Sequence, residues 1–202
     1  MTTVPAALVG KRITVVDVEG NGGQPPEIIE IAVLTIDGEV SGEKLRTWLV
    51  RPRQPIAELV TRKVHGITNA DVADAPTWPQ VADDVAGALT DRILVAHHAS
   101  VEHRVLSAHL PTWRPALILD TLRLAKHVWP DLPSYSLDRL IVHAALDHST
   151  VASQYHRADW DTWMTAQLLL TLVEHGNLDW PRLVTVAALP GFGQPQPGAG
   201  LW

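Results

Sequence analysis

Two carboxylates, Asp17 and Glu19, stand two positions apart in a run of β-branched residues, and they are the first candidates for chemistry in the sequence. Residues i and i+2 of a strand point to the same face of a sheet, so both carboxylates would project from one face. Their apolar neighbours indicate a buried strand, where two acids repel each other and lose hydration. A hard divalent cation such as Mg²⁺ or Mn²⁺ would relieve both costs. The pair alone is also compatible with a strand that ends at Asp17 and leaves both acids in water.

A third acid, Asp161, falls on the apolar stripe of a helix that we predict from about residue 157 to 175. An unpaired acid is costly among apolar neighbours, whereas a metal ligand is well placed there. His156 comes just before this helix, and a histidine with a near-neutral pKa can take a proton from an attacking water. The alternative interpretation is a surface histidine followed by an aspartate that is bonded to backbone.

A fourth acid, Glu102, falls on the first turn of a helix that follows a strand ending near His97. An acid at this position favours the helix dipole, which is its structural explanation. Its functional explanation is a further carboxylate at the carboxyl ends of the strands, where mixed sheets place their sites. A histidine-rich zinc site is disfavoured, because the spacing does not put three of the nearby histidines on one helical face. These histidines are His97, His98, His103 and His109.

The hydrophobic pattern, which predicts the elements that must position these residues, changes from the period of strands to that of helices along the chain. Three strands at residues 12–19, 27–38 and 44–52 predict an antiparallel meander, with a flexible loop at residues 20–26. Helices are then predicted at 56–66, at 77–89, from a Ser100 cap to 110, at 121–127 and at 136–144, with strands at 91–98 and 116–120. The fold class is therefore α/β, a mixed five-stranded sheet flanked by helices. We expect one domain over residues 1–188 and a poorly ordered Pro/Gly-rich tail over 189–202.

Composition limits the function classes. With 202 residues, 46% of them hydrophobic, the chain can build one globular core, and the absence of cysteine excludes disulfides, thiolate metal sites and cysteine nucleophiles. We find neither a secretory signal nor an apolar run near the roughly 20 residues of a membrane span, so we expect a cytoplasmic protein with no membrane contact. The net charge of −6 argues against a protein that grips long nucleic acids, but is compatible with one that handles a chain end.

Taken in order, five segments resemble the DEDDh branch of the DnaQ-like 3′→5′ exonucleases. The first motif is Asp-x-Glu in DVEGNG, the second is AHHASVE, which ends on Glu102, and the third is HRADWD, with His156 and Asp161. VHGITNADVADAPTW lies between the first and second motifs, and LDTLRLAKHVWPDLPSYSLDRL precedes the third. The similarity runs from about residue 12 to 174. Any one motif could arise by chance, but five in order indicate the family.

The resemblance implies an RNase H-like fold and catalysis with two divalent cations, Mg²⁺ or Mn²⁺. It implies that Asp17, Glu19 and Asp161 bind the first cation, and that Asp17 bridges to a second cation with Glu102 nearby. It assigns His156 as the general base. The residues it implies for holding the terminal nucleotide are Val18, Gly20, His65 and His98.

The sequence departs from the family pattern at several of these positions. Glu102 stands where the family has aspartate, His98 replaces an asparagine, and Gly20 and Asn21 replace threonines. We therefore predict a 3′→5′ exonuclease that releases nucleoside 5′-monophosphates from single-stranded or short DNA or RNA 3′ ends. The alternatives are a phosphodiesterase for a small nucleotide and a catalytically degenerate module that binds nucleic acid or protein. A homodimer or a protein partner is compatible with each of them.

Overall fold

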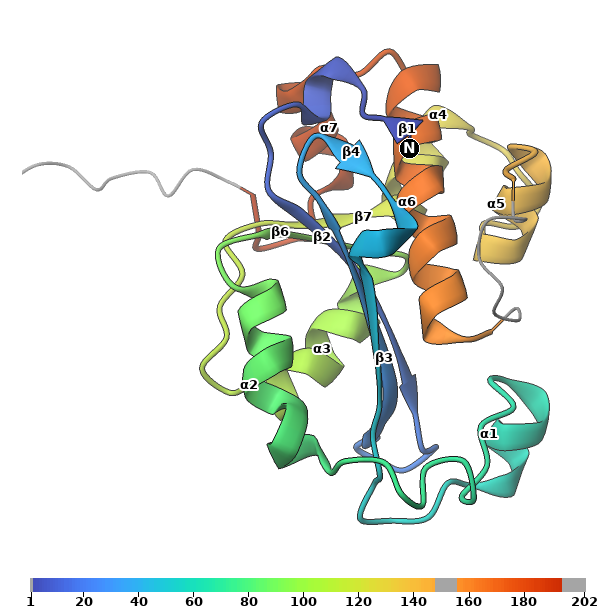
Figure 1. The fold of residues 1–202 in the computed structure, drawn as a ribbon. Coiled ribbons are helices and arrows are strands. Elements are labelled where there is room, and N and C mark those ends of the chain that lie inside the picture. The colour runs from blue at the N-terminus through green and yellow to red at the C-terminus, as the bar shows by residue number, and fades with distance from the viewer. Residues whose placement is uncertain (1, 148–155, 194–202) are drawn as a thin grey trace, which may run out of the picture.

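The computed structural model describes residues 2–147 and 156–193, and a five-stranded sheet runs through its centre (Figure 1). The strand order is β5–β3–β2–β6–β7. In it β5 (Leu45–Leu49), β3 (Ile28–Ile36) and β2 (Ile13–Gly20) are antiparallel neighbours, while β6 (Ile93–Ala96) and β7 (Ile118–Asp120) run parallel to β2. A separate small sheet joins β1 (Thr2–Thr3) to β4 (Glu39–Val40). The predicted mixed five-stranded sheet is confirmed.

Helices cover both faces of this sheet (Figure 1). On one face lie α2 (Trp78–Leu89) and α3 (Ala99–His109). On the other lie α4 (Thr121–Val128), α6 (Ala158–His175) and α7 (Trp180–Ala187), with α5 (Leu137–His143) packed against α6. The six-residue α1 (Glu58–Lys63) lies beyond the end of the sheet at which β2 finishes and β3 begins. Two short 3₁₀ helices span Ala6–Leu8 and Gly42–Lys44.

The two faces of β2 belong to two different cores, because successive strand residues point in opposite directions. Val15 packs in the core under α6, whereas Val16 packs in the core under α2 and α3. Continuing this alternation, Asp17 and Glu19 lie on the α6 side of the sheet. Most residues of the α6 helix are buried, and its polar residues Asp161, Thr162 and Thr165 are among them. The strand and the helix together therefore fix where the acids meet.

Two α-helices, α7 and α3, differ from the sequence predictions. The α7 helix was not predicted, although Asp179 accepts a hydrogen bond from the Arg182 N–H at 2.9 Å, and Pro181 follows in the first turn, which is a typical helix start. The α3 helix does not begin at a Ser100 cap. It begins at Ala99, after His98 in the left-handed conformation (φ 63°), because the Asp120 carboxylate holds the His98 N–H at 3.0 Å.

The first residues of the predicted tail contact the domain. The Leu189 N–H donates to the Ile118 carbonyl at 2.9 Å, and the Phe192 ring meets the His103 ring edge-on at 4.8 Å. Residues 194–202 of that predicted tail lie outside the described residues. Across the described ranges, every helix falls short of the length and apolar character that a bilayer crossing requires.

Candidate active site

Three carboxylates meet where β2 passes under the start of α6. Ligand oxygens of Asp17, Glu19 and Asp161 all lie within 4.8 Å of one another. Asp17 and Glu19 come from β2, and Asp161 comes from the first turn of α6. Residues 17 and 161 are thus brought together by the packing of α6 on β2 and β3. Oxygen donors at this spacing form a set that a hard divalent cation can bind.

Glu102 reaches the same place from the other layer. It lies on the first turn of α3, is 6% exposed, and accepts a hydrogen bond from the backbone of Val18. That N–H is open because β6 pairs with β2 only as far as Val15. Glu102 lies outside the tight group of three acids, yet its Oε2 is buried and has no hydrogen-bond partner among the described residues. A buried, unpartnered carboxylate oxygen is costly unless a cation or a proton compensates it.

Burial and mutual repulsion raise the pKa of every acid in this cluster. Burial, and then the charge of Asp161, raises the pKa of Glu19 to about 8. Burial, and then the charge of Glu19, raises the pKa of Glu102 to about 8. Burial is also the main reason that the pKa of Asp161 rises to about 7 and that of Asp17 rises well above its usual range. The chain supplies too little positive charge for all these acids to ionise together.

One acid beside the cluster is neutralised by the chain, and sequence reasoning missed it. Glu30 on β3 sits directly opposite Glu19 on β2 and is fully buried. It binds the Arg157 guanidinium through Nε at 3.0 and 3.1 Å and through a second guanidinium nitrogen. It also accepts the Ala158 N–H at 2.9 Å. The available signal was a single acid inside the apolar run IIEIAVLTI.

His156 lies one residue before Arg157, which is the N-cap of α6. Its backbone is in the left-handed region (φ 63°) and its side chain is half-buried. A histidine is one of the few side chains besides asparagine and aspartate that visit this region with some frequency. The turn places His156 just before the start of α6, five positions before Asp161.

Three of the four residues implied for nucleotide binding gather at the end of β2. Val18 and Gly20 are half-buried strand residues. Burial lowers the pKa of His65, and the nearby backbone of Gly20 offsets part of this lowering. The His65 Nδ1 accepts the Ile67 N–H at 3.0 Å, while its Nε2 is buried without a hydrogen-bond partner. The ring therefore places its Nε2 close to the Gly20 backbone. The fourth residue, His98, is exposed at the N-cap of α3.

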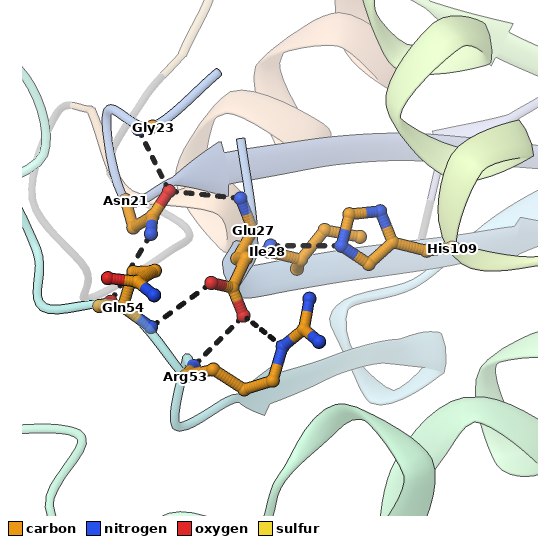
Figure 2. A network of polar contacts seen from close by, with 7 residues as sticks. All are labelled: Asn21, Gly23, Glu27, Ile28, Arg53, Gln54 and His109. Atoms are coloured by element: carbon orange, nitrogen blue, oxygen red, sulfur yellow. Dashed lines mark hydrogen bonds and ion pairs between the residues drawn. The ribbon is translucent and has the colours of Figure 1, made fainter. Parts of the chain in front are cut away.

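The loop after Glu19 is fastened by its own side chains, contrary to the flexible loop that we predicted. The buried Asn21 accepts the N–H groups of Gly23 and Glu27 at 3.0 and 2.9 Å and donates to the Gln54 carbonyl at 3.2 Å (Figure 2). The Glu27 carboxylate in turn accepts both backbone N–H groups of Arg53 and Gln54. Asn21 therefore organises the loop, and its carbonyl oxygen and one of its two amide N–H donors are used within that network.

The histidines near Glu102 do not form a metal site. His97 bonds the Thr121 hydroxyl at 2.9 Å and the Tyr135 carbonyl at 3.0 Å, and His109 bonds the Val105 carbonyl at 2.8 Å. Within residues 2–147 and 156–193, the acids Asp17, Glu19 and Asp161 are the one group of three with metal-ligand spacing. The zinc alternative thus has no support in the described part of the chain.

Comparisons with known proteins agree with this geometry. A protein family described as Exonuclease matches residues 14–169. The DNA polymerase III subunit epsilon of Aquifex aeolicus is 29% identical over 175 residues, which cover 83% of each protein. Exodeoxyribonuclease 10 of Escherichia coli is 31% identical over 182 residues, which cover 89% of this chain and 77% of that protein.

A solved structure, Exonuclease X in complex with 5′ overhanging duplex DNA, is similar with a TM-score of 0.71 at 30% identity. The similarity covers 86% of this chain and 98% of that chain. Sequence and structure thus match over most of both proteins, and the matched range contains all four acids. The chain belongs to the exonuclease family, among the DEDDh-type 3′→5′ exonucleases, with Glu102 at the position where the second motif usually has aspartate.

Proposed function

We propose that the chain is a metal-dependent exonuclease that removes nucleoside 5′-monophosphates one at a time from 3′ ends of single-stranded or short nucleic acids. The observation that carries this proposal is the group of Asp17, Glu19 and Asp161, whose ligand oxygens lie within 4.8 Å of one another. The buried carboxylate of Glu102 lies beside them. This acid-rich position coincides with the motifs that define the family.

The residues present fit two divalent cations, Mg²⁺ or Mn²⁺. The donors are all carboxylates, which suit hard ions, and the unpartnered Glu102 Oε2 offers a further ligand atom. Asp17, Glu19 and Asp161 would hold one cation, while Asp17 and Glu102 would hold the other. When bound, the cations supply positive charge that stabilises the attacking and leaving oxygens of an in-line displacement.

The chain's own side chains would carry the proton and hold the strand end. His156 would accept the proton of the attacking water, because it is a half-buried imidazole just before the first turn of α6, which carries Asp161. The buried Nε2 of His65, together with the backbone of Val18 and Gly20, would hold the terminal sugar and base. His98, exposed at the start of α3, would contact the nucleic-acid strand from the side of the site where Glu102 lies.

The net charge of −6 favours a substrate that meets the protein only at its end. Exonuclease X was solved with a 5′ overhanging duplex, so a recessed 3′ end in a duplex belongs among the substrates to be compared. Asn21 gives no support to a small-nucleotide phosphodiesterase, because its side chain is used inside the loop.

The test is a substrate panel with Mn²⁺: 5′-labelled single-stranded DNA, single-stranded RNA, a duplex with a recessed 3′ end, and dinucleotides. We expect a ladder that shortens from the 3′ end, with nucleoside 5′-monophosphates as the only small product. Blocking the 3′ hydroxyl with a 3′ phosphate should slow the reaction. Turnover of dinucleotides alone, or cuts inside a 3′-blocked strand, would contradict the proposal.

A further inference from the structure

Two of the charged residues near the acids take no part in the roles proposed above. Glu30 and Arg157 are separated by 127 positions in the chain, yet they form a two-pronged ion pair beside the cluster. The Glu30 side chain is 1% exposed and the Arg157 side chain is 34% exposed. Because burying an ion pair costs desolvation energy that can exceed the attraction between its charges, the pair does not by itself indicate a gain in stability. Its position beside the acids suggests another role.

The pair holds the first turn of α6 against the sheet at three points. The first N–H groups of a helix have no partner within it, and Glu30 supplies one by accepting the Ala158 N–H at 2.9 Å. A carboxylate at a helix N-terminus also interacts favourably with the helix dipole. The guanidinium fork fixes direction as well as distance, because both of its prongs must meet the same carboxylate.

This turn is where the proposed catalytic side chains of α6 are found. His156 directly precedes Arg157, and Asp161 donates its backbone N–H to the Arg157 carbonyl at 3.0 Å. On the strand side, Glu30 stands opposite Glu19 in the β2–β3 register. The pair thus ties the element that carries His156 and Asp161 to the strand beside the one that carries Asp17 and Glu19.

We propose that Glu30 and Arg157 are positioning residues, which set Asp161 and His156 at the distance from β2 that cation binding and proton transfer require. The inference rests on the proposed function. Outer residues that orient metal ligands typically contribute 10- to 100-fold in affinity or activity, and a displacement of about 1 Å can cost about 100-fold in rate.

A purely electrostatic role predicts different results, and this allows a sharp test. If Arg157 acted only through its charge, Arg157→Met would leave the site more negative and Mn²⁺ would bind more tightly. If Arg157 positions α6, the same substitution weakens Mn²⁺ binding. The double variant Glu30→Gln with Arg157→Met restores the parent's net charge but not the fork. It also leaves no unpaired buried charge, so it should fold even if Arg157→Met does not.

Asp37→Asn provides a matched control. The Asp37 carboxylate forms a two-pronged pair with Arg92 at 3.0 and 3.1 Å, at the far end of the sheet from the acids. Calorimetry with Mn²⁺ and steady-state kinetics on the single-stranded oligonucleotide would be run on all variants. Folding would be checked by circular dichroism and thermal unfolding.

We expect Arg157→Met and the double variant to bind Mn²⁺ about 10- to 100-fold more weakly and to lose kcat more than they raise KM. Asp37→Asn should match the parent in both measurements. Parent-like Mn²⁺ affinity and kcat in the double variant, or tighter Mn²⁺ binding in Arg157→Met, would overturn the positioning role. If Mn²⁺ bound Asp17→Asn as well as the parent, the proposed function itself would fail, and the inference with it.

Discussion

The two ends of the central sheet carry opposite charges, and these charges are compensated to different extents. At the end where β2 and β6 begin, a hollow of about 650 Å³ is lined by basic residues that include Lys11, Arg92 and Arg114. Each has a partner from the chain. Arg92 pairs with Asp37, Arg114 donates to two backbone carbonyls, and Lys11 lies over the Trp180 ring at 4.6 Å. At this end, these three basic side chains are held by partners from the chain.

At the other end, residues 2–147 and 156–193 supply no such partners for the acids. Asp17, Glu19 and Asp161 face one another at ligand distance, and the Glu102 Oε2 has no hydrogen bond. The contrast is sharpest between Glu19 and Glu30, which are direct cross-strand neighbours. Like charges in that position destabilise a sheet. Arg157 neutralises Glu30, whereas Glu19 forms no ion pair with a described residue. Uncompensated charge therefore marks the site better than charge itself.

Asp17→Asn should have the largest effect, because Asp17 would contact both cations. We expect activity below about 1% of the parent, since even outer residues of metal sites contribute 10- to 100-fold. The domain should remain folded, as one of the repelling carboxylates is removed. Kinetics on the labelled oligonucleotide, with circular dichroism as the folding control, would measure this. Activity near the parent's would place the cations elsewhere.

His156→Ala should slow the chemical step by about 10²- to 10⁴-fold, the range typical for the loss of a general base. Mn²⁺ affinity should change little, because His156 is proposed to handle a proton and not a cation. Single-turnover rates and calorimetry on the same preparation would separate the two effects. A variant that turned over as fast as the parent would rule out this role for His156.

Glu102→Asp should reduce activity by about 10-fold, within the range for residues that tune a metal site. Shortening the side chain by one methylene withdraws the carboxylate from the Val18 backbone that it now meets. Mn²⁺ titrations of activity would show a higher half-saturating concentration. Faster cleavage by the aspartate variant would mean that the glutamate is a handicap in this protein.

The pH dependence of stability should follow the acids. Glu19 and Glu102 have pKa values near 8 in the fold against 4.5 when exposed, so between those values the folded protein binds protons that the unfolded chain has released. Without metal, the contribution of these two protonated acids to the free energy of unfolding is therefore fully present below about pH 4.5 and is lost as the pH rises toward 8. Thermal unfolding in EDTA from pH 5 to 8 should show a falling Tm.

Mn²⁺ should restore this loss, with a larger rise in Tm at pH 8 than at pH 5. Asp17→Asn in EDTA should lose less stability over the same pH range than the parent. A Tm in EDTA that rises between pH 5 and 8 would contradict the charges assigned to the acid cluster.

Asp37→Asn at the basic end should have the smallest effect. The pair is partly exposed, with Asp37 at 44%, and such pairs contribute about 0.2–1 kcal/mol. For a domain of this size the Tm should fall by about 4 °C at most. Activity should stay within about twofold of the parent. A large loss of activity would mean that the two ends of the sheet are coupled.

Much of the framework could be predicted from the sequence, because local patterns produce it. The β-branched runs around Val15 and Ile31 made strands, and the spacing of Val81, Val85 and Leu89 placed one face of α2 in the core. Asp17, Glu19 and Asp161 could be singled out because each carboxylate lies in an apolar pattern, and Glu102 because it closely follows the end of a strand. The antiparallel and parallel halves of the sheet followed from short and long connections.

The remaining features depend on residues far apart in the chain. Arg157 meets Glu30 from 127 positions away, and Asp120 fixes the His98 turn from 22 positions away. The role of Asn21 depends on Gln54, which comes from another loop (Figure 2). No local period encodes such pairs. They become visible only when the fold brings the segments together.

The most direct test is cleavage of a 5′-labelled single-stranded oligonucleotide with Mn²⁺, beside EDTA, Asp17→Asn and Asp37→Asn. We predict a ladder descending from the 3′ end with the parent and with Asp37→Asn, and an intact strand with EDTA and with Asp17→Asn. Cleavage that persists in EDTA or in Asp17→Asn would contradict the claim that the uncompensated acids at this end of the sheet hold the catalytic cations.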